Sequence, residues 1–230
     1  MREIVLDTET TGIDHAKGHR VVEIGAVELI NHIPSGKTFH CYIDPERDMP
    51  SDAEAIHGLS TQFLKGKPLF SAIAQEFIAF IGEASLVIHN AAFDVGFLNA
   101  EFARVNQPTI LPERVVDTLA LARQKHPMGP NSLDALCKRY GIDNSKRDKH
   151  GALLDSELLA DVYLELIGGR QAALSLSAIT VSARAAIAPL GLVRARPHPL
   201  ASRLSEAEII AHTALIAELG DKALWNDLLN

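Results

Sequence analysis

The chain has 230 residues and a formal net charge of −7, and 47% of its residues are hydrophobic. This length is enough for one sizeable core plus an appendage. The negative charge argues against a protein that wraps a duplex with many Lys and Arg contacts, but it is compatible with an enzyme that holds a few nucleotides and bound metal. Apolar stretches stay shorter than the roughly 20 residues that a membrane helix needs.

Three apolar runs near the start of the chain predict strands. They cover residues 3–7, 21–30 and 37–43 and are rich in β-branched side chains. Turn residues from His32 to Gly36 separate the second run from the third, so we expect an antiparallel meander. The first run begins almost at the N-terminus, which predicts that no signal peptide is present.

After residue 68, helical and strand patterns alternate. Helical spacing covers residues 68–82, 91–106, 119–125, 131–142 and 152–167, and short apolar strands are expected at 84–90 and 114–118. Gly141 is a plausible C-cap of the fourth of these helices. Strands followed by alternating strands and helices predict an α/β fold with a mixed sheet flanked by helices. Cys41 and Cys137 fall in separate elements, so we expect two free thiols in a reducing cytoplasm.

The composition changes sharply near residue 167. From Leu166 to Ser205 there is no Asp or Glu, but there are five Arg and three Pro among many Ala and Ser. This composition is typical of a linker. Ser205 and Glu208 then form an S-x-x-E capping box, and Gly220 can end the helix that begins there. We therefore divide the chain into a domain at 1–167, a linker at 168–204 and a helical tail at 205–230.

The predicted tail helix has an apolar stripe. Ile209, Thr213 and Ile216 fall on one face, and Trp225 follows the helix. A lone helix of this length is marginal in water, so its apolar face needs a surface. That surface is either the first domain or a groove on another protein, where Trp225 would be an anchor.

Acidic side chains stand where a site is expected. Asp7 and Glu9 project to the same side of the first strand, at its end, although exposed acids at strand ends are also common. Asp94 follows a later strand near a helix start, His150 precedes the last helix of the domain, and Asp155 opens the apolar face of that helix. An acid on a buried helix face is costly unless it is paired or binds metal. Four converging acids would suit two divalent ions about 4 Å apart.

Three motifs carry a family resemblance. DTETTG at 7–12, HNAAFD at 89–94 and HGALLD at 150–155 resemble the motifs of the DEDDh 3′→5′ exonucleases. Across residues 2–167, segments such as VVEIGAVEL, AIHGL and SLDALCKRYGID are similar to the proofreading epsilon subunits of bacterial DNA polymerase III. The resemblance implies a ribonuclease H-like fold. It also implies that Asp7, Glu9, Asp94 and Asp155 hold two Mg²⁺ or Mn²⁺ ions and that His150 is the general base.

The resemblance also implies residues that bind the 3′-terminal nucleotide. Asp7, Glu9 and Asp155 would contact it together with Thr10, Gly12, Asp52 and His57. Thr10 could instead cap a turn, and Asp52 could instead be an acid at a helix N-terminus.

Several neighbouring residues favour structural interpretations. We expect His89 to be structural, and Phe93 and Phe97 to be core residues rather than base-stacking platforms. Lys146, Arg147 and Lys149 flank His150, and a solvated loop is a simpler interpretation for them than contact with phosphate.

The implied function is removal of mismatched 3′-terminal nucleotides during DNA replication in a bacterial cytoplasm. The implied partners are a single-stranded 3′ end of DNA, the polymerase alpha subunit through residues 205–230 and a small theta-like subunit. Residues Gln171–Leu176 (QAALSL) resemble the short peptide that binds the sliding clamp, although so short a motif also arises by chance. A free-standing exonuclease that trims RNA or short oligonucleotides and a non-catalytic assembly module are the alternatives.

Overall fold

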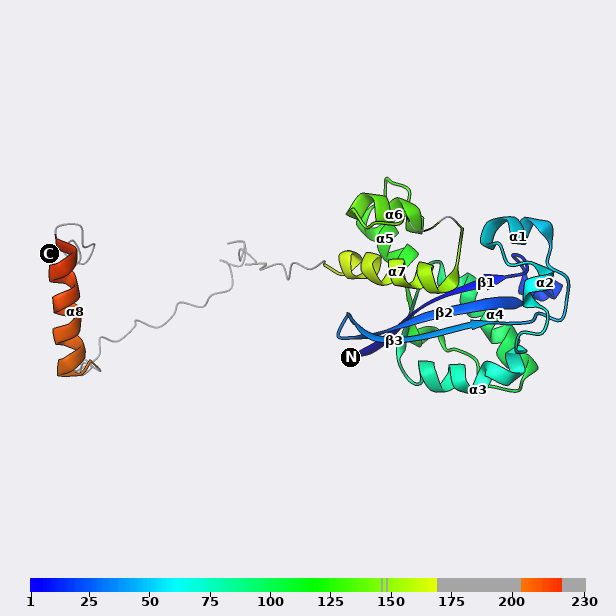
Figure 1. The fold of residues 1–230 in the computed structure, drawn as a ribbon, viewed down its shortest axis with the longest axis horizontal. Helices are drawn as coiled ribbons and strands as arrows, with labels where there is room; N and C mark the ends of the chain where they lie inside the picture. Colours follow the sequence, from blue (N-terminus) through cyan, green and yellow to red (C-terminus); the bar gives the residue numbers. More distant parts are fainter. Residues whose placement is uncertain (146, 148, 169–203, 221–230) are drawn as a thin grey trace, which may run out of the picture. The chain divides into compact units, whose positions relative to one another are not determined.

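The computed structural model describes residues 1–145, 147, 149–168 and 204–220 (Figure 1). Described residues up to 168 belong to one compact unit, and residues 204–220 belong to another. Most of the predicted linker, the Gln171–Leu176 motif and Trp225 lie outside the described residues.

The first unit is built on a five-stranded mixed sheet with the strand order β3-β2-β1-β4-β5 (Figure 1). β1 (Arg2–Thr10) pairs antiparallel with β2 (Val21–Ile30), which pairs antiparallel with β3 (Ile33–Tyr42). β1 also pairs in parallel with β4 (Ser85–Ile88), and β4 pairs in parallel with β5 (Val115–Asp117). The predicted meander and the mixed α/β sheet are thus confirmed.

The turn between β2 and β3 differs from the prediction. Asn31 and His32 both have positive φ, at 51° and 67°, and they form a two-residue hairpin turn that matches the twist of the strands. β3 therefore begins at Ile33, and the predicted turn from His32 to Gly36 is wrong. The register shifts between Val27 and Leu29, opposite the segment that contains Gly36. An edge strand tolerates such an irregularity.

The predicted helices are present within a few residues of their expected bounds. They are α3 (Phe70–Ile81), α4 (Ala91–Arg104), α5 (Thr118–Lys125), α6 (Leu133–Tyr140) and α7 (Ala152–Leu166). Gly141 is the C-cap of α6, as predicted. Two short helices, α1 (Ser51–His57) and α2 (Thr61–Leu64), and two 3₁₀ turns, His15–Lys17 and Pro112–Arg114, are additional to the predicted elements. Only the alternative role of Asp52 implied a helix start near α1.

The alternation of side chains along β1 decides what lies on each face of the sheet. Ile4 and Leu6 belong to the large core that contains residues of α3 and α4, including Phe77. Val5 points to the opposite face and packs with Leu159 of α7. In Figure 1, α7 and α3 accordingly lie on opposite sides of the sheet. Residues in register with Val5 therefore face α7, and these include the two acids at the end of β1.

A glycine in β2 lets α7 approach the sheet. Gly25 pairs with Asp7 of β1, and a side-chain carbon at Gly25 would overlap the backbone of Ala152 and Leu153. Ser156 Oγ donates a hydrogen bond of 2.9 Å to the Gly25 carbonyl. The first turn of α7 is thus fixed directly against the strand next to Asp7.

In the second unit, α8 (Glu206–Leu219) has the predicted start and end. Ser205 and Glu208 form the capping box, and Gly220 is the C-cap. Ile210, Leu215 and Leu219 are all exposed. None of the described helices is long and apolar enough to cross a membrane. Cys41 and Cys137 are free thiols, as predicted.

We predict that Gly25→Ala lowers the free energy of unfolding by about 3 kcal/mol, because the added methyl group must displace the backbone of α7. Urea unfolding of the purified full chain measures this change. Gly36→Asn is the control, because Gly36 lies in open space at a positive φ that Asn tolerates. The control should stay within about 0.5 kcal/mol of the wild type. Equal stability of Gly25→Ala and the wild type would contradict the close contact.

Candidate active site

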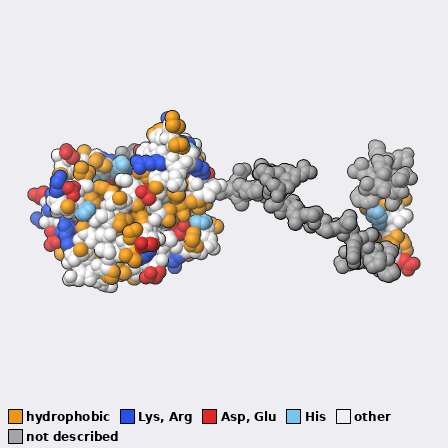
Figure 2. Space-filling model, turned by 180° about the vertical axis from the view of Figure 1, so that it is seen from behind, with side chains coloured by type: hydrophobic (Ala, Val, Ile, Leu, Met, Phe, Trp, Pro, Cys, Tyr) orange, Lys and Arg blue, Asp and Glu red, His pale blue; other side chains and the backbone are white. Residues whose placement is uncertain are grey.

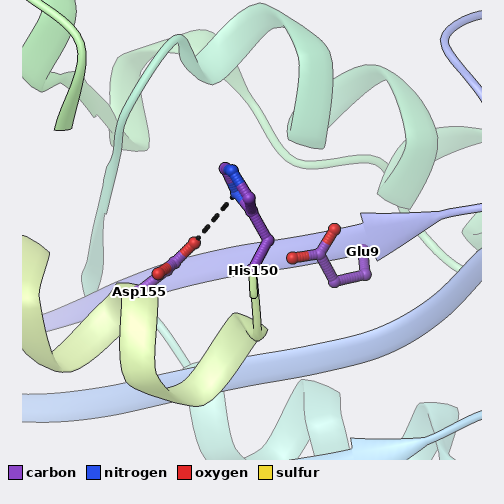
Figure 3. Close-up of side chains that lie close together, drawn as sticks. All are labelled: Glu9, His150 and Asp155. Carbon is purple, nitrogen blue, oxygen red and sulfur yellow. Dashed lines mark ion pairs between the residues drawn. The ribbon is translucent and has the colours of Figure 1, made fainter. Parts of the chain in front are cut away.

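Four acids from three elements line one cavity of about 750 Å³. Asp7 and Glu9 come from the end of β1, and Asp94 and Asp155 come from the first turns of α4 and α7. Asp94 and Asp155 are each only 3% exposed. Figure 3 shows that Glu9 and Asp155 reach toward the same space from strand and helix, with the His150 ring between them. The structure thus brings together all four acids that the sequence singled out.

Thr8 holds Asp94 in place. The Thr8 backbone N–H and hydroxyl both donate to Asp94 Oδ1, at 3.0 and 2.6 Å. Thr8 alternates with Asp7 and Glu9 along β1, so it faces the side of the sheet where α4 lies. Thr8 was not among the predicted site residues, although its position between the two acids in DTETTG points to the site.

The electrostatics of the cluster favour a bound cation. Burial, together with the charge of neighbouring acids, raises the pKa of Glu9 to about 8 and the pKa of Asp7 well above its ordinary value. Burial also raises the pKa of Asp94 to about 7, although its hydrogen bonds from Thr8 act in the opposite direction. A divalent ion would relieve this repulsion, and carboxylate oxygens are the ligands that hard cations prefer. Ligand atoms of Glu9, His150 and Asp155 lie within 4.8 Å of one another, which suits such an ion.

His150 lies at the mouth of the cavity. Its side chain is 48% exposed, and Nδ1 lies 3.4 Å from Asp155 Oδ2 (Figure 3). Its backbone N–H donates to the Ile56 carbonyl at 3.3 Å, which ties the residue to α1. A half-exposed imidazole beside the acids can take a proton inside the cavity and release it to solvent.

The prediction of a solvated loop is wrong for Arg147. Its side chain is only 7% exposed, and the guanidinium forms ion pairs with both Asp155 and Asp134. Its sequence position between other charged residues carried no signal for burial, because the contact depends on how α6 and α7 pack.

A second cavity of about 400 Å³ adjoins the first, and Glu9 lines both. The four additional residues expected to bind substrate all line the second cavity, namely Thr10, Gly12, Asp52 and His57. Thr10 Oγ1 also donates to the Gly12 carbonyl at 2.7 Å, so the predicted turn contact is present as well. A side chain on Gly12 would overlap the ring of His19, which would have to move to make room.

His57 and Asp52 differ in their surroundings. His57 is buried, its Nδ1 accepts a 3.0 Å hydrogen bond from the Leu59 N–H, and burial lowers its pKa. Asp52 is exposed in the first turn of α1, where an acid also stabilises a helix N-terminus. Both interpretations of Asp52 therefore stay open.

Two residues predicted to be structural line the main cavity. Phe97 is buried in the core, as predicted, and the half-buried Phe93 packs against that core but also lines both cavities. His89 lines the main cavity, and its Nδ1 lies 2.9 Å from Thr118 Oγ1. His89 and Phe93 both belong to the HNAAFD motif, which ends at Asp94, and this is the sequence signal that points to the site.

Comparison with known proteins shows which families this chain resembles. The exonuclease family RNase T matches residues 4–163. A DNA polymerase III subunit epsilon from Rickettsia felis is 56% identical over 75% of this chain and 77% of its own length. The subunit epsilon of Escherichia coli K12 is 43% identical over 97% of both chains.

Solved structures share the fold at lower identity. Exonuclease I superposes with a TM-score of 0.62 at 19% identity, covering 72% of this chain and 40% of that one. Exonuclease X in complex with 5′ overhanging duplex DNA gives a TM-score of 0.53 at 24% identity, covering 72% and 90%. These likenesses confirm the ribonuclease H-like fold.

The fold, the buried acids and the family match define a 3′–5′ exonuclease that depends on divalent metal. The more similar relatives narrow the class further. The chain belongs to the family of DNA polymerase III epsilon subunits.

Stability should depend on pH through the buried acids. The pKa of Glu9 is about 8 in the folded state and 4.5 ordinarily, so the folded state holds more protons between these values. Stability therefore falls as the pH rises through this window. In EDTA, the melting temperature should fall less between pH 5 and pH 8 for Glu9→Gln than for the wild type.

Differential scanning calorimetry of both proteins, in matched buffers, checks this expectation. Glu113→Gln is the control, because Glu113 is an exposed acid that lines neither cavity. Parallel curves for the wild type and Glu9→Gln would contradict the assigned electrostatics.

Proposed function

We propose that this chain is the proofreading subunit of a bacterial DNA polymerase III and removes mismatched nucleotides from the 3′ end of a DNA strand. The observation that carries the proposal is the placement of the four acids and His150 around one cavity that adjoins a second, nucleotide-sized cavity. The similarity to the Escherichia coli subunit extends over 97% of the chain, including the tail, which favours a replicase subunit over a free-standing nuclease that trims RNA.

Asp7, Glu9, Asp94 and Asp155 would hold two Mg²⁺ or Mn²⁺ ions. When bound, two such ions supply Lewis-acid stabilisation for both the attacking and the leaving oxygen of the phosphate. All four acids come from the ends of regular elements, which keep the oxygens rigid. Thr8 also orients Asp94 through its two hydrogen bonds.

His150 would be the general base. It would take the proton from the attacking water and pass it to solvent through its exposed edge. Histidine suits this role because its ordinary pKa lies near neutral pH. The terminal nucleotide would lie in the second cavity, with Thr10, Gly12 and His57 around it and Asp52 at its rim.

The net charge of the chain is negative, so it has little excess positive charge with which to wrap DNA. On the face shown in Figure 2, basic and acidic side chains are interspersed with apolar ones and form no continuous basic band. A frayed single-stranded 3′ end is therefore a better substrate than a long duplex, because the bound ions would supply the positive charge at the reacting phosphate.

The tail would bind the polymerase alpha subunit. α8 exposes Ile210, Leu215 and Leu219, and an isolated helix of this length gains stability by burying such residues in a groove. Residues 168–204 would act as a tether that raises the concentration of the nuclease near the primer end. A sliding clamp at Gln171–Leu176 and a small theta-like subunit are further proposed partners, and the bacterial cytoplasm is the proposed location.

Asp7→Ala and Asp155→Ala should abolish release of a mismatched 3′ nucleotide, because each removes a carboxylate from the metal site. His150→Ala should slow the chemical step by about 10²- to 10⁴-fold. Release of a labelled 3′ nucleotide from mismatched DNA in Mg²⁺ measures both effects, with circular dichroism to verify folding. Near-wild-type turnover in Asp7→Ala would contradict the site, and faster cleavage of RNA than of mismatched DNA would favour the free-standing nuclease.

Truncation after residue 170 should leave hydrolysis of free single-stranded DNA nearly unchanged and remove stable association with the alpha subunit. Gel filtration of the mixed proteins at low micromolar concentration measures the association. Leu215→Asp in the full chain is the matched point variant and should weaken binding in the same direction. A truncated protein that still comigrates with the polymerase would show that the tail is not the tether.

A further inference from the structure

Arg147 places a cation inside the acidic cavity. Its Nη2 donates to Asp155 Oδ2 at 2.7 Å, and its Nε donates to Oδ1 at 2.5 Å. Nη1 donates to Asp134 Oδ1 at 2.7 Å, and Nη2 also lies 2.8 Å from His150 Nδ1. One buried guanidinium therefore joins α6, α7 and His150.

The contact with Asp155 is a bidentate fork that engages both carboxylate oxygens. Such charge-assisted pairs are among the stronger hydrogen bonds in proteins, and a buried carboxylate without one is costly. Asp155 is 3% exposed and faces Asp7 and Glu9, whose raised pKa values Arg147 partly offsets. Arg147 thus compensates the charge that a divalent ion would otherwise compensate.

A divalent ion held by Asp155 would have to share this carboxylate with the guanidinium. An ion shared by Asp155 and Glu9 needs an Asp155 oxygen that points into the cavity, and both oxygens are bonded to Arg147. A guanidinium within hydrogen-bond distance of the ligand would also repel the ion, because the two positive charges would lie close together beside a buried carboxylate.

We propose that Arg147 is a positioning residue that holds Asp155 until a divalent cation displaces its guanidinium. The proposal rests on the proposed metal site. The side chain of Asp134 is 57% exposed and pairs with Nη1 of Arg147. This ion pair persists on the solvent side when the guanidinium leaves Asp155, so it anchors the displaced Arg147 side chain. Displacement also removes Nη2 from His150 Nδ1, so metal binding frees the imidazole.

The test is calorimetric titration of the full chain with Mn²⁺ in the absence of DNA. Arg147→Gln should bind Mn²⁺ about tenfold or more tightly than the wild type, because the competing cation is gone. Arg147→Lys should also bind more tightly, because lysine keeps the charge but lacks the fork that grips both oxygens. In EDTA, both variants should melt at a lower temperature than the wild type.

A second buried pair provides the matched control. Arg20 forms the same kind of fork with Glu101, at 2.6 and 3.0 Å. Arg20→Lys should lower the melting temperature in EDTA without changing the affinity for Mn²⁺. This result separates loss of a buried ion pair from loss of competition with the metal.

The possible outcomes are distinct. Unchanged or weaker Mn²⁺ binding in both Arg147 variants overturns the proposal. Tighter binding in Arg147→Gln with wild-type binding in Arg147→Lys also overturns it, because charge alone would then explain the effect. If neither the wild type nor the Arg147 variants bind Mn²⁺, the proposed metal site itself is wrong. If the wild type binds Mn²⁺ and the Arg147 variants bind it with the same affinity, the metal site is supported and only the role of Arg147 is wrong.

Discussion

Carboxylates that share a buried cavity repel one another, and each also loses the hydration that stabilises its charge. Burial raises the pKa of Asp7, Glu9 and Asp94, and the neighbouring acids of the cavity raise those of Asp7 and Glu9 further, while Asp155 is held by a buried arginine. A fold keeps such a cluster only if rigid elements enforce it and a cation compensates it. The dependence of this exonuclease on divalent metal follows from that constraint.

The scaffold enforces the cluster through a few specific contacts. Alternation along β1 sends Asp7 and Glu9 to the face that α7 covers, while Ile4 and Leu6 anchor the strand in the opposite core. Gly25 lets the first turn of α7 meet β2, which sets the height of Asp155 above the sheet. On the other face, hydrogen bonds from Thr8 hold Asp94 at the strand end. The second cavity then opens beside Glu9.

Much of this arrangement could be predicted from the sequence, because local patterns encode it. Strand alternation placed Asp7 and Glu9 on one side, and the cost of an acid on an apolar helix face marked Asp155. Other features depend on contacts between distant segments. The burial of Arg147 depends on Asp134 and Asp155, and the role of Gly25 depends on residues more than 120 positions away. Helices as short as α1 and α2 show too few turns for periodicity to reveal them.

We propose that the four acids hold two divalent ions side by side. Crystals grown with Mn²⁺ and thymidine 5′-monophosphate would reveal these ions through anomalous diffraction at the manganese edge. We expect two peaks about 4 Å apart in the cavity that Asp7, Glu9, Asp94 and Asp155 line. Peaks that contact neither Asp7 nor Asp155, or no Mn²⁺ peak in the cavity, would contradict it.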